Sequence, residues 1–80
     1  MSISERVLTI LESVAERDDL RQDIDIQLYD EHILDSLKTV ELMIALSEAF
    51  NIEIAPASFE RAQWSTPRLI SAYVEQAVRA

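Results

Sequence analysis

The chain has 80 residues and a formal net charge of −8, with 15 acidic against 7 basic side chains. This length fits one small domain. The excess of acids argues against binding to nucleic acid or to an anionic membrane surface, because both need clustered lysine and arginine. The sequence contains no cysteine, which excludes a disulfide framework, a thiolate metal site and a thiol nucleophile of the protein itself.

The sequence shows neither a membrane-spanning segment nor a secretory signal. Its longest apolar run is the five residues from Leu42 to Leu46, which is too short to cross or insert into a bilayer. Residues 1–5 lack the basic and apolar regions of a secretory signal. No oligomerisation signal stands out. We therefore expect a soluble cytoplasmic monomer that forms a single domain over residues 1–80.

Helical spacing of apolar residues predicts a first helix over residues 3–16. Ser2 followed three residues later by Glu5 has the form of a capping box at its start. The apolar residues that define one stripe are Ile3, Val7, Ile10, Leu11 and Val14.

Residues 16–35 follow neither a helical nor a strand period. They hold eight acidic residues and two arginines, interrupted by scattered apolar side chains. A structureless connection of this length is unusual in a compact domain and is usually functional when it is ordered. We expect a long connection with one short helical turn, pinned to the core by Leu20, Ile24, Ile26, Leu28, Tyr29, Ile33 and Leu34.

Asp35 predicts the start of a second helix over residues 36–50, because its carboxylate can accept an unpaired backbone N–H at the positive end of the helix. Asn51 is a plausible end, since asparagine tolerates the left-handed conformation. A short turn is expected from Pro56 to Arg61. Thr66 and Pro67 then fit the N-cap and first position of a last helix, over residues 67–79. The pattern predicts an all-α fold, an irregular four-helix bundle with three long helices, one short helix and a long first connection.

The predicted second helix carries two apolar stripes. Leu42, Met43, Leu46 and Phe50 form the larger stripe, which we expect to face the core. The smaller stripe has acids beside it, as a docking surface with an apolar centre and a polar rim would. The alternative is that neighbouring helices bury both stripes. The residues of the smaller stripe are Leu37, Val40 and Ile44, with Glu41 and Glu48.

Ser36 stands just inside the start of this helix. A serine at such a position is commonly a capping or solvated residue. The alternative is a modification site, because exposed amides and the helix dipole would stabilise an attached phosphate there. In that case Asp35 could help to orient the hydroxyl group.

Asp35-Ser36-Leu37 followed by Thr39-Val40-Glu41-Leu42 resembles the phosphopantetheine attachment motif of acyl and peptidyl carrier proteins. The resemblance covers nearly the whole chain and implies an acyl-carrier-protein-like bundle. Phe59-x-Arg61-x-x-Trp64-x-Thr66-Pro67, together with Leu34 before the motif, is similar to the D-alanyl carrier proteins of teichoic-acid D-alanylation. A purely structural role for this second block, with Phe59 and Trp64 closing one end of the core, is compatible with that resemblance.

The resemblance implies a non-catalytic carrier with 4′-phosphopantetheine attached to Ser36. Its implied partners are a phosphopantetheinyl transferase, an ATP-dependent D-alanine ligase that forms D-alanyl adenylate, and a membrane acyltransferase or export machinery. The smaller stripe, Leu37, Val40 and Ile44 with Glu41 and Glu48, would be the surface that these partners recognise. A fatty-acid carrier should open a pocket for its chain, whereas D-alanine needs none.

The chain departs from the family pattern at three positions. His32 and Asn51 stand where carriers often have glycine, and both residue types tolerate positive φ. Lys38 stands where carriers commonly have glycine or an acid.

Two alternatives to the D-alanyl carrier remain at this point. One is a carrier for a different acyl or aminoacyl group. The other is an unmodified acidic helical module that binds a basic partner. An enzyme built on His32, Asp35 and Ser36 is disfavoured, because a catalytic triad also needs a cleft and a third group that orients the base.

Overall fold

The computed structural model describes residues 2–54 and 59–79, and all regular structure in these residues is helical. In chain order the helices are α1 (Ile3–Ala15), the short 3₁₀ helix η1 (Leu20–Gln22), α2 (Ser36–Phe50), the short 3₁₀ helix η3 (Arg61–Gln63) and α3 (Pro67–Arg79). The predicted all-α class is thus confirmed for the described residues.

Each of the three α-helices begins and ends close to its predicted limits. Ser2 caps α1 by accepting a hydrogen bond from the Glu5 N–H at 3.1 Å, and Thr66 accepts from the Leu69 N–H at 3.2 Å at the start of α3. Helix α1 ends at Ala15, one residue before the predicted limit, because Glu16 turns into the left-handed region with φ 58°. Sequence reasoning had no signal for this, since glutamate is not a usual left-handed residue.

The connection between α2 and α3 is only partly described. Its predicted short turn begins at Pro56, and residues 55–58 lie outside the described residues. The described part contains η3, which begins at Arg61, where the predicted turn was to end.

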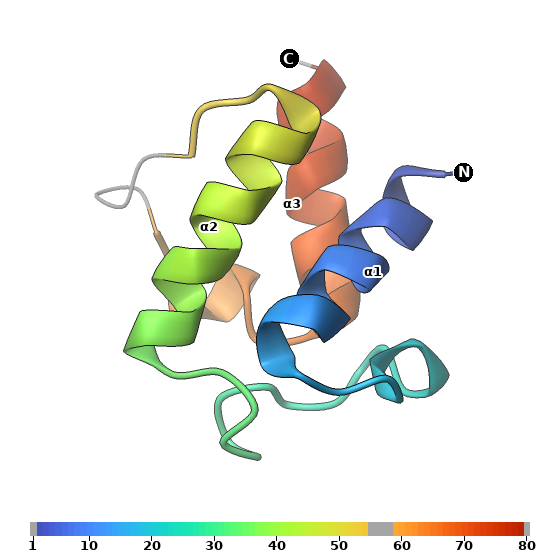
Figure 1. The fold of residues 1–80 in the computed structure, drawn as a ribbon, viewed down its shortest axis with the longest axis vertical. Coiled ribbons are helices and arrows are strands. Elements are labelled where there is room, and N and C mark those ends of the chain that lie inside the picture. The colour runs from blue at the N-terminus through green and yellow to red at the C-terminus, as the bar shows by residue number, and fades with distance from the viewer. Residues whose placement is uncertain (1, 55–58, 80) are drawn as a thin grey trace.

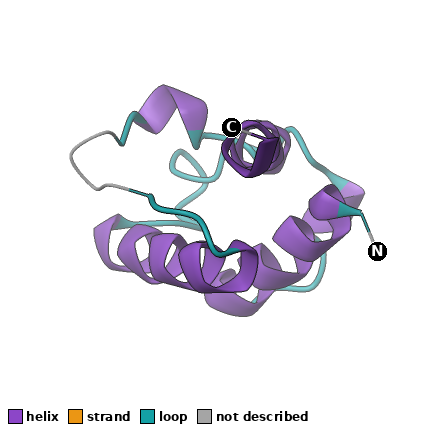
Figure 2. Ribbon diagram, turned by 90° about the horizontal axis from the view of Figure 1, so that it is seen from above, coloured by secondary structure: helices purple, strands orange, loops and turns teal. Residues whose placement is uncertain are grey.

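Helix α1 packs against both of the other α-helices. In Figure 1, α2 is on the left, α1 on the right and α3 between them in this view, and the connection over residues 16–35 passes beneath the helices. Figure 2 views α3 almost end-on while α2 and α1 extend across the picture, so α3 is steeply inclined to α2. All three α-helices and the connection contribute to one core, whose most deeply buried hydrophobic side chains are Val7, Leu11, Leu20, Leu28, Leu42, Leu46, Trp64, Ile70 and Val74.

The long acidic connection is anchored to the core at six of its seven predicted apolar positions. Ile26 and Tyr29 pack against the core while partly buried, whereas Ile24 is half-buried and does not belong to the core cluster. Leu20, Leu28, Ile33 and Leu34 are buried, and η1 supplies the expected short helical turn. Polar contacts add to this anchoring, because Asp25 accepts two hydrogen bonds from the Arg68 guanidinium at the start of α3, at 2.8 and 3.1 Å. The connection therefore holds the start of α2 in a fixed place relative to the rest of the fold.

Candidate functional site

Ser36 is exposed and is the first residue of α2. Asp35 caps the helix, since its Oδ1 accepts a hydrogen bond from the Lys38 N–H at 2.8 Å and its carbonyl oxygen accepts from the Thr39 N–H at 2.9 Å. The Ser36 hydroxyl thus lies beside the positive end of the α2 dipole, where an attached phosphate group would be stabilised. The residues present fit a covalently bound phosphopantetheine arm at this position.

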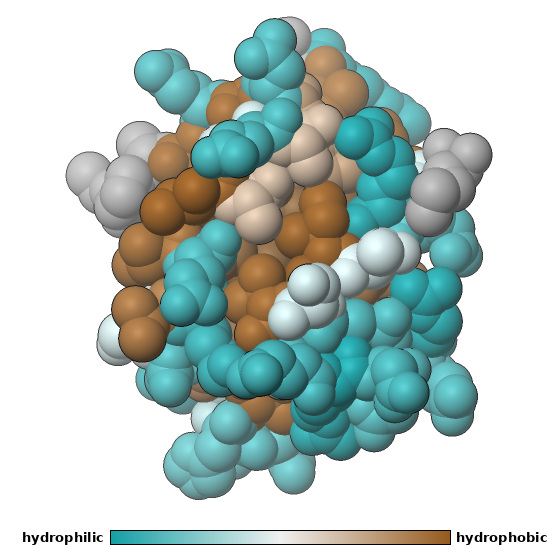
Figure 3. Space-filling model, viewed as in Figure 1, coloured by the Kyte–Doolittle hydropathy of each residue, from teal (hydrophilic) through white to brown (hydrophobic). Residues whose placement is uncertain are grey.

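The two apolar stripes of α2 have different surroundings. In the larger stripe Leu42, Met43 and Leu46 are buried and Phe50 is half-buried, as expected of core residues. The smaller stripe remains exposed, so burial of both stripes is ruled out. Figure 3 shows apolar surface, in brown, gathered on the side where α2 lies in Figure 1. The exposed fractions of the smaller stripe are 68% for Leu37, 47% for Val40 and 55% for Ile44.

The Lys38 side chain is not a free surface charge, because its ammonium group contacts the end of α1. Its Nζ donates to the carbonyl oxygen of Val14 at 3.3 Å and lies 3.3 Å from Oε2 of Glu16. A cation at the C-terminal end of a helix interacts favourably with the negative end of the dipole. The charge of Lys38 is therefore directed at the end of α1, and the lysine joins α2 to α1.

The two residues that replace the usual glycines have the conformation that glycine would supply. His32 has φ 60° and Asn51 has φ 53°. Asn51 ends α2 by donating its N–H to the Ser47 carbonyl oxygen. The prediction that these residue types tolerate positive φ at these two positions is confirmed.

A groove of about 550 Å³ opens beside Ser36. The Tyr29 hydroxyl lies 2.8 Å from Oγ1 of Thr39, and the Arg61 guanidinium stacks 4.8 Å from the centre of the Tyr29 ring. Burial raises the pKa of Tyr29 above its usual value, against the opposing effects of the Thr39 hydrogen bond and the Arg61 charge. The phenol is therefore a neutral hydrogen-bonding group. The residues lining this groove are Tyr29, His32, Leu34, Asp35, Ser36, Thr39, Val40, Met43, Phe59 and Arg61.

A row of aromatic rings connects this groove to α3. Phe59 lies edge-on to Tyr29 at 6.4 Å and to Trp64 at 5.8 Å, measured between ring centres, and Trp64 lies 5.3 Å from Tyr73. Trp64 is only 1% exposed. The structural role predicted for the second sequence block is thus confirmed, because Phe59 and Trp64 close the core while Thr66 starts α3.

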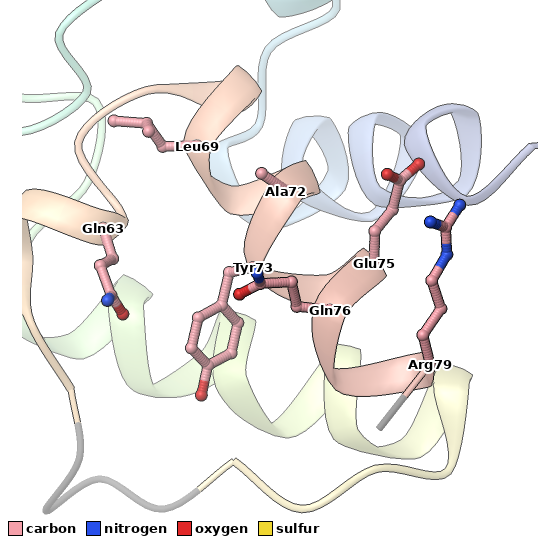
Figure 4. Close-up of a pocket in the computed structure, with 7 residues that line it drawn as sticks. All are labelled: Gln63, Leu69, Ala72, Tyr73, Glu75, Gln76 and Arg79. Carbon is pink, nitrogen blue, oxygen red and sulfur yellow. The ribbon is translucent and has the colours of Figure 1, made fainter.

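A separate hollow of about 420 Å³ lies along α3 (Figure 4). The side chains of Gln63 and Tyr73 lie on one side of it, and those of Glu75 and Arg79 on the other. None of the predicted site residues lines this hollow. The serine, its cap and the exposed stripe of α2 instead share one region of the surface.

Sequence reasoning identified the α2 residues of this region but missed the opposite wall of the groove. Tyr29, Phe59 and Arg61 come from two connections that are far apart in the sequence, and only the fold brings them beside Ser36. Phe59 and Arg61 were visible as parts of a motif, but no local pattern tied them to the serine.

Comparison with known proteins agrees with this geometry. Residues 5–74 match the family described as "Phosphopantetheine attachment site". A D-alanyl carrier protein of Listeria monocytogenes serotype 4a (strain HCC23) is 40% identical over 75 residues, covering 94% of this chain and 96% of the relative. A D-alanyl carrier protein of Bacillus cereus (strain B4264) is 39% identical over 72 residues, covering 90% of this chain and 91% of the relative.

These matches extend over nearly all of both chains, so the similarity includes α1, α2 and most of α3 rather than one short motif. Among the described residues, none of the helices has both the length and the apolarity needed to cross a membrane. The chain therefore belongs to the D-alanyl carrier protein family, a group of non-catalytic carriers with a covalently attached 4′-phosphopantetheine.

Proposed function

We propose that the chain carries D-alanine as a thioester on a 4′-phosphopantetheine arm attached to Ser36. A phosphopantetheinyl transferase would join Ser36 Oγ to the phosphorus of the arm while the pyrophosphate bond of coenzyme A breaks, the hydroxyl proton is lost and adenosine 3′,5′-bisphosphate leaves. The arm supplies the thiol that the protein lacks. The observation that carries the proposal is the exposed, dipole-facing position of Ser36 in a chain whose relatives are D-alanyl carriers.

The donor in this proposal is an ATP-dependent D-alanine ligase that passes the alanyl group from D-alanyl adenylate to the thiol with release of AMP. The acceptor is a membrane acyltransferase or export machinery that uses the group to D-alanylate lipoteichoic acid, teichoic acid or a related cell-envelope polymer. In this proposal the protein is a monomer in the cytoplasm, where ATP is available. Residues 1–80 form a single carrier domain, in which a short fourth helix lies between α2 and α3.

The exposed stripe of α2 would be the surface that these partners recognise in turn. Leu37, Val40 and Ile44 provide an apolar centre, and Glu41 and Glu48 are exposed beside it. Acidic side chains steer a basic partner toward the carrier and mainly raise the rate of encounter. A small apolar centre suits brief complexes, because a carrier must leave each partner after transfer.

Loading experiments test the cargo directly. The phosphopantetheinylated protein is incubated with a D-alanine ligase, ATP and either D-alanine or L-alanine, and the intact mass is measured. We expect a gain of one alanyl group with D-alanine and little gain with L-alanine. Equal loading by both, or loading only by a fatty acyl or other aminoacyl ligase, would contradict the proposed cargo and favour a carrier of another pathway.

A further inference from the structure

Two hollows follow one another along the same side of α2. The groove beside Ser36 has a volume of about 550 Å³, and a second hollow of about 360 Å³ lies farther along the helix. Val40 and Met43 line both, so the two hollows adjoin. The second hollow is lined by Val40, Met43, Ile44, Ser47, Glu48 and Ile54.

The α2 residues along these hollows share one face of the helix. Ser36, Val40, Met43 and Ser47 are spaced at i, i+4, i+7 and i+11, which places them in a row. The row from Ser36 to Ser47 is roughly 16 Å long at the rise of an α-helix. A pantetheine arm has the main-chain length of about four to five amino-acid residues and spans roughly 15 Å when extended. An arm that starts at Ser36 can therefore end at the second hollow.

The far end of this path carries a negative charge. The second hollow is mostly apolar, and its Ser47 hydroxyl already donates a hydrogen bond to the Met43 carbonyl oxygen at 2.7 Å. Glu48 is exposed, and among the described residues no lysine or arginine forms an ion pair with it. Its carboxylate is thus available to a cationic group that enters the hollow.

We propose that the loaded arm lies along this groove and that Glu48 binds the α-ammonium group of the D-alanyl cargo. This inference rests on the proposed function. A fatty acyl group carries no cation, so the carboxylate would favour an aminoacyl cargo over it. Val40 and Met43 would contact the apolar part of the arm, and Glu41, which lines neither hollow, would not contact the cargo.

The test compares two cargoes that differ only at the amino group. A phosphopantetheinyl transferase attaches either a D-alanyl or a propionyl arm directly from the corresponding acyl-coenzyme A, without any ligase, and the intact mass confirms that the arm is attached. Backbone amide signals are then assigned by NMR in isotope-labelled protein with the unloaded, propionyl and D-alanyl arms. Glu48→Gln removes the proposed contact, and Glu41→Gln makes the same change of charge on the same helix outside the groove.

We expect both cargoes to shift the amide signals of Val40, Met43 and Ser47, and only the D-alanyl cargo to shift that of Glu48. Glu48→Gln should abolish the difference between the cargoes, and Glu41→Gln should preserve it. The pKa of the D-alanyl ammonium should fall in Glu48→Gln, since the carboxylate that stabilises the charged amine is removed.

The outcomes separate this inference from the proposed function. Identical spectra of the unloaded and D-alanyl forms along α2 would overturn the path of the arm. Equal effects of propionyl and D-alanyl arms at Glu48 would overturn the recognition of the ammonium group. In both cases the arm would still be attached, so the carrier function would stand. If the mass shows no attachment, the proposed function itself fails, and this inference fails with it.

Discussion

Individual residues of α2 show how one helix serves both the core and the surface. Leu46 is fully buried between helices, whereas Ile44, two residues earlier, has 55% of its surface exposed. The sequence allowed this division to be predicted from helical spacing, because a core can face only one side of a helix. It did not reveal the direction of Lys38, since a long side chain can reach the end of a neighbouring helix only once that helix is placed beside it.

Leu46→Ala and Ile44→Ala form a matched pair of substitutions that separates folding from recognition. Leu46→Ala should lower the free energy of unfolding by about 2–5 kcal/mol, because it leaves a cavity in the core. Ile44→Ala should change stability by less than about 0.5 kcal/mol, as exposed positions generally do, and should slow loading by the partner ligase. Urea unfolding and single-turnover loading measure the two effects. Equal destabilisation by both substitutions would contradict the assignment of the exposed face.

The packing of the helices depends on how the long connection is attached to them. Its apolar anchors could be predicted, because isolated leucines and isoleucines in an acidic segment indicate burial. Its polar attachments could not be predicted, since each joins the connection to a helix whose position beside it is set only by the fold. Arg21 in η1 donates to the Glu12 carboxylate in α1 at 2.8 Å, and Arg68 binds Asp25 across 43 positions. The groove beside Ser36 could not be predicted either, because its walls come from separate connections.

The contact between η1 and α1 predicts a pH dependence of stability. The hydrogen bonds from Arg21 hold the pKa of Glu12 below its usual value of 4.5. A lowered pKa in the folded state stabilises the protein above pH 4.5, and this contribution is lost as the pH falls through the lowered value. Glu12→Gln should therefore destabilise the protein near neutral pH, and the difference from wild type should shrink as the pH is lowered toward about 3.

Chemical unfolding over this pH range measures the effect of Glu12→Gln. Glu53→Gln, at an exposed position after α2, is the control and should show no such trend. A difference between wild type and Glu12→Gln that stays constant with pH would contradict a role for the ionised carboxylate.

For the whole molecule, the net charge of −8 is the dominant electrostatic feature. Several ion pairs offset it locally, including those of Asp19 with Arg17 and Asp25 with Arg68, but acids outnumber bases by more than two to one. The sign and size of this charge could be read from composition. Composition gave no indication that the acidic connection would pack closely enough to hold Ser36 at a fixed helix start.

The excess of negative charge predicts that the unmodified protein becomes more stable as salt is added. Ions at about 0.1 M screen charges over roughly 10 Å, so they weaken repulsion between acids on the same small surface. They also weaken the exposed ion pairs, but these contribute little individually. The midpoint of thermal unfolding should rise between about 0.02 M and 0.5 M sodium chloride. A midpoint that does not change, or that falls, would show that repulsion does not limit stability.

The proposed carrier function depends on attachment of the phosphopantetheine arm at Ser36. The most direct measurement is the intact mass after incubation with a broad-specificity phosphopantetheinyl transferase and coenzyme A, with Ser36→Ala as the control. Substitution at this exposed position should leave the fold intact, which circular dichroism can verify. We predict a gain of one phosphopantetheine in the wild type and none in Ser36→Ala. No gain in folded wild-type protein, or an equal gain in both, would contradict the assignment.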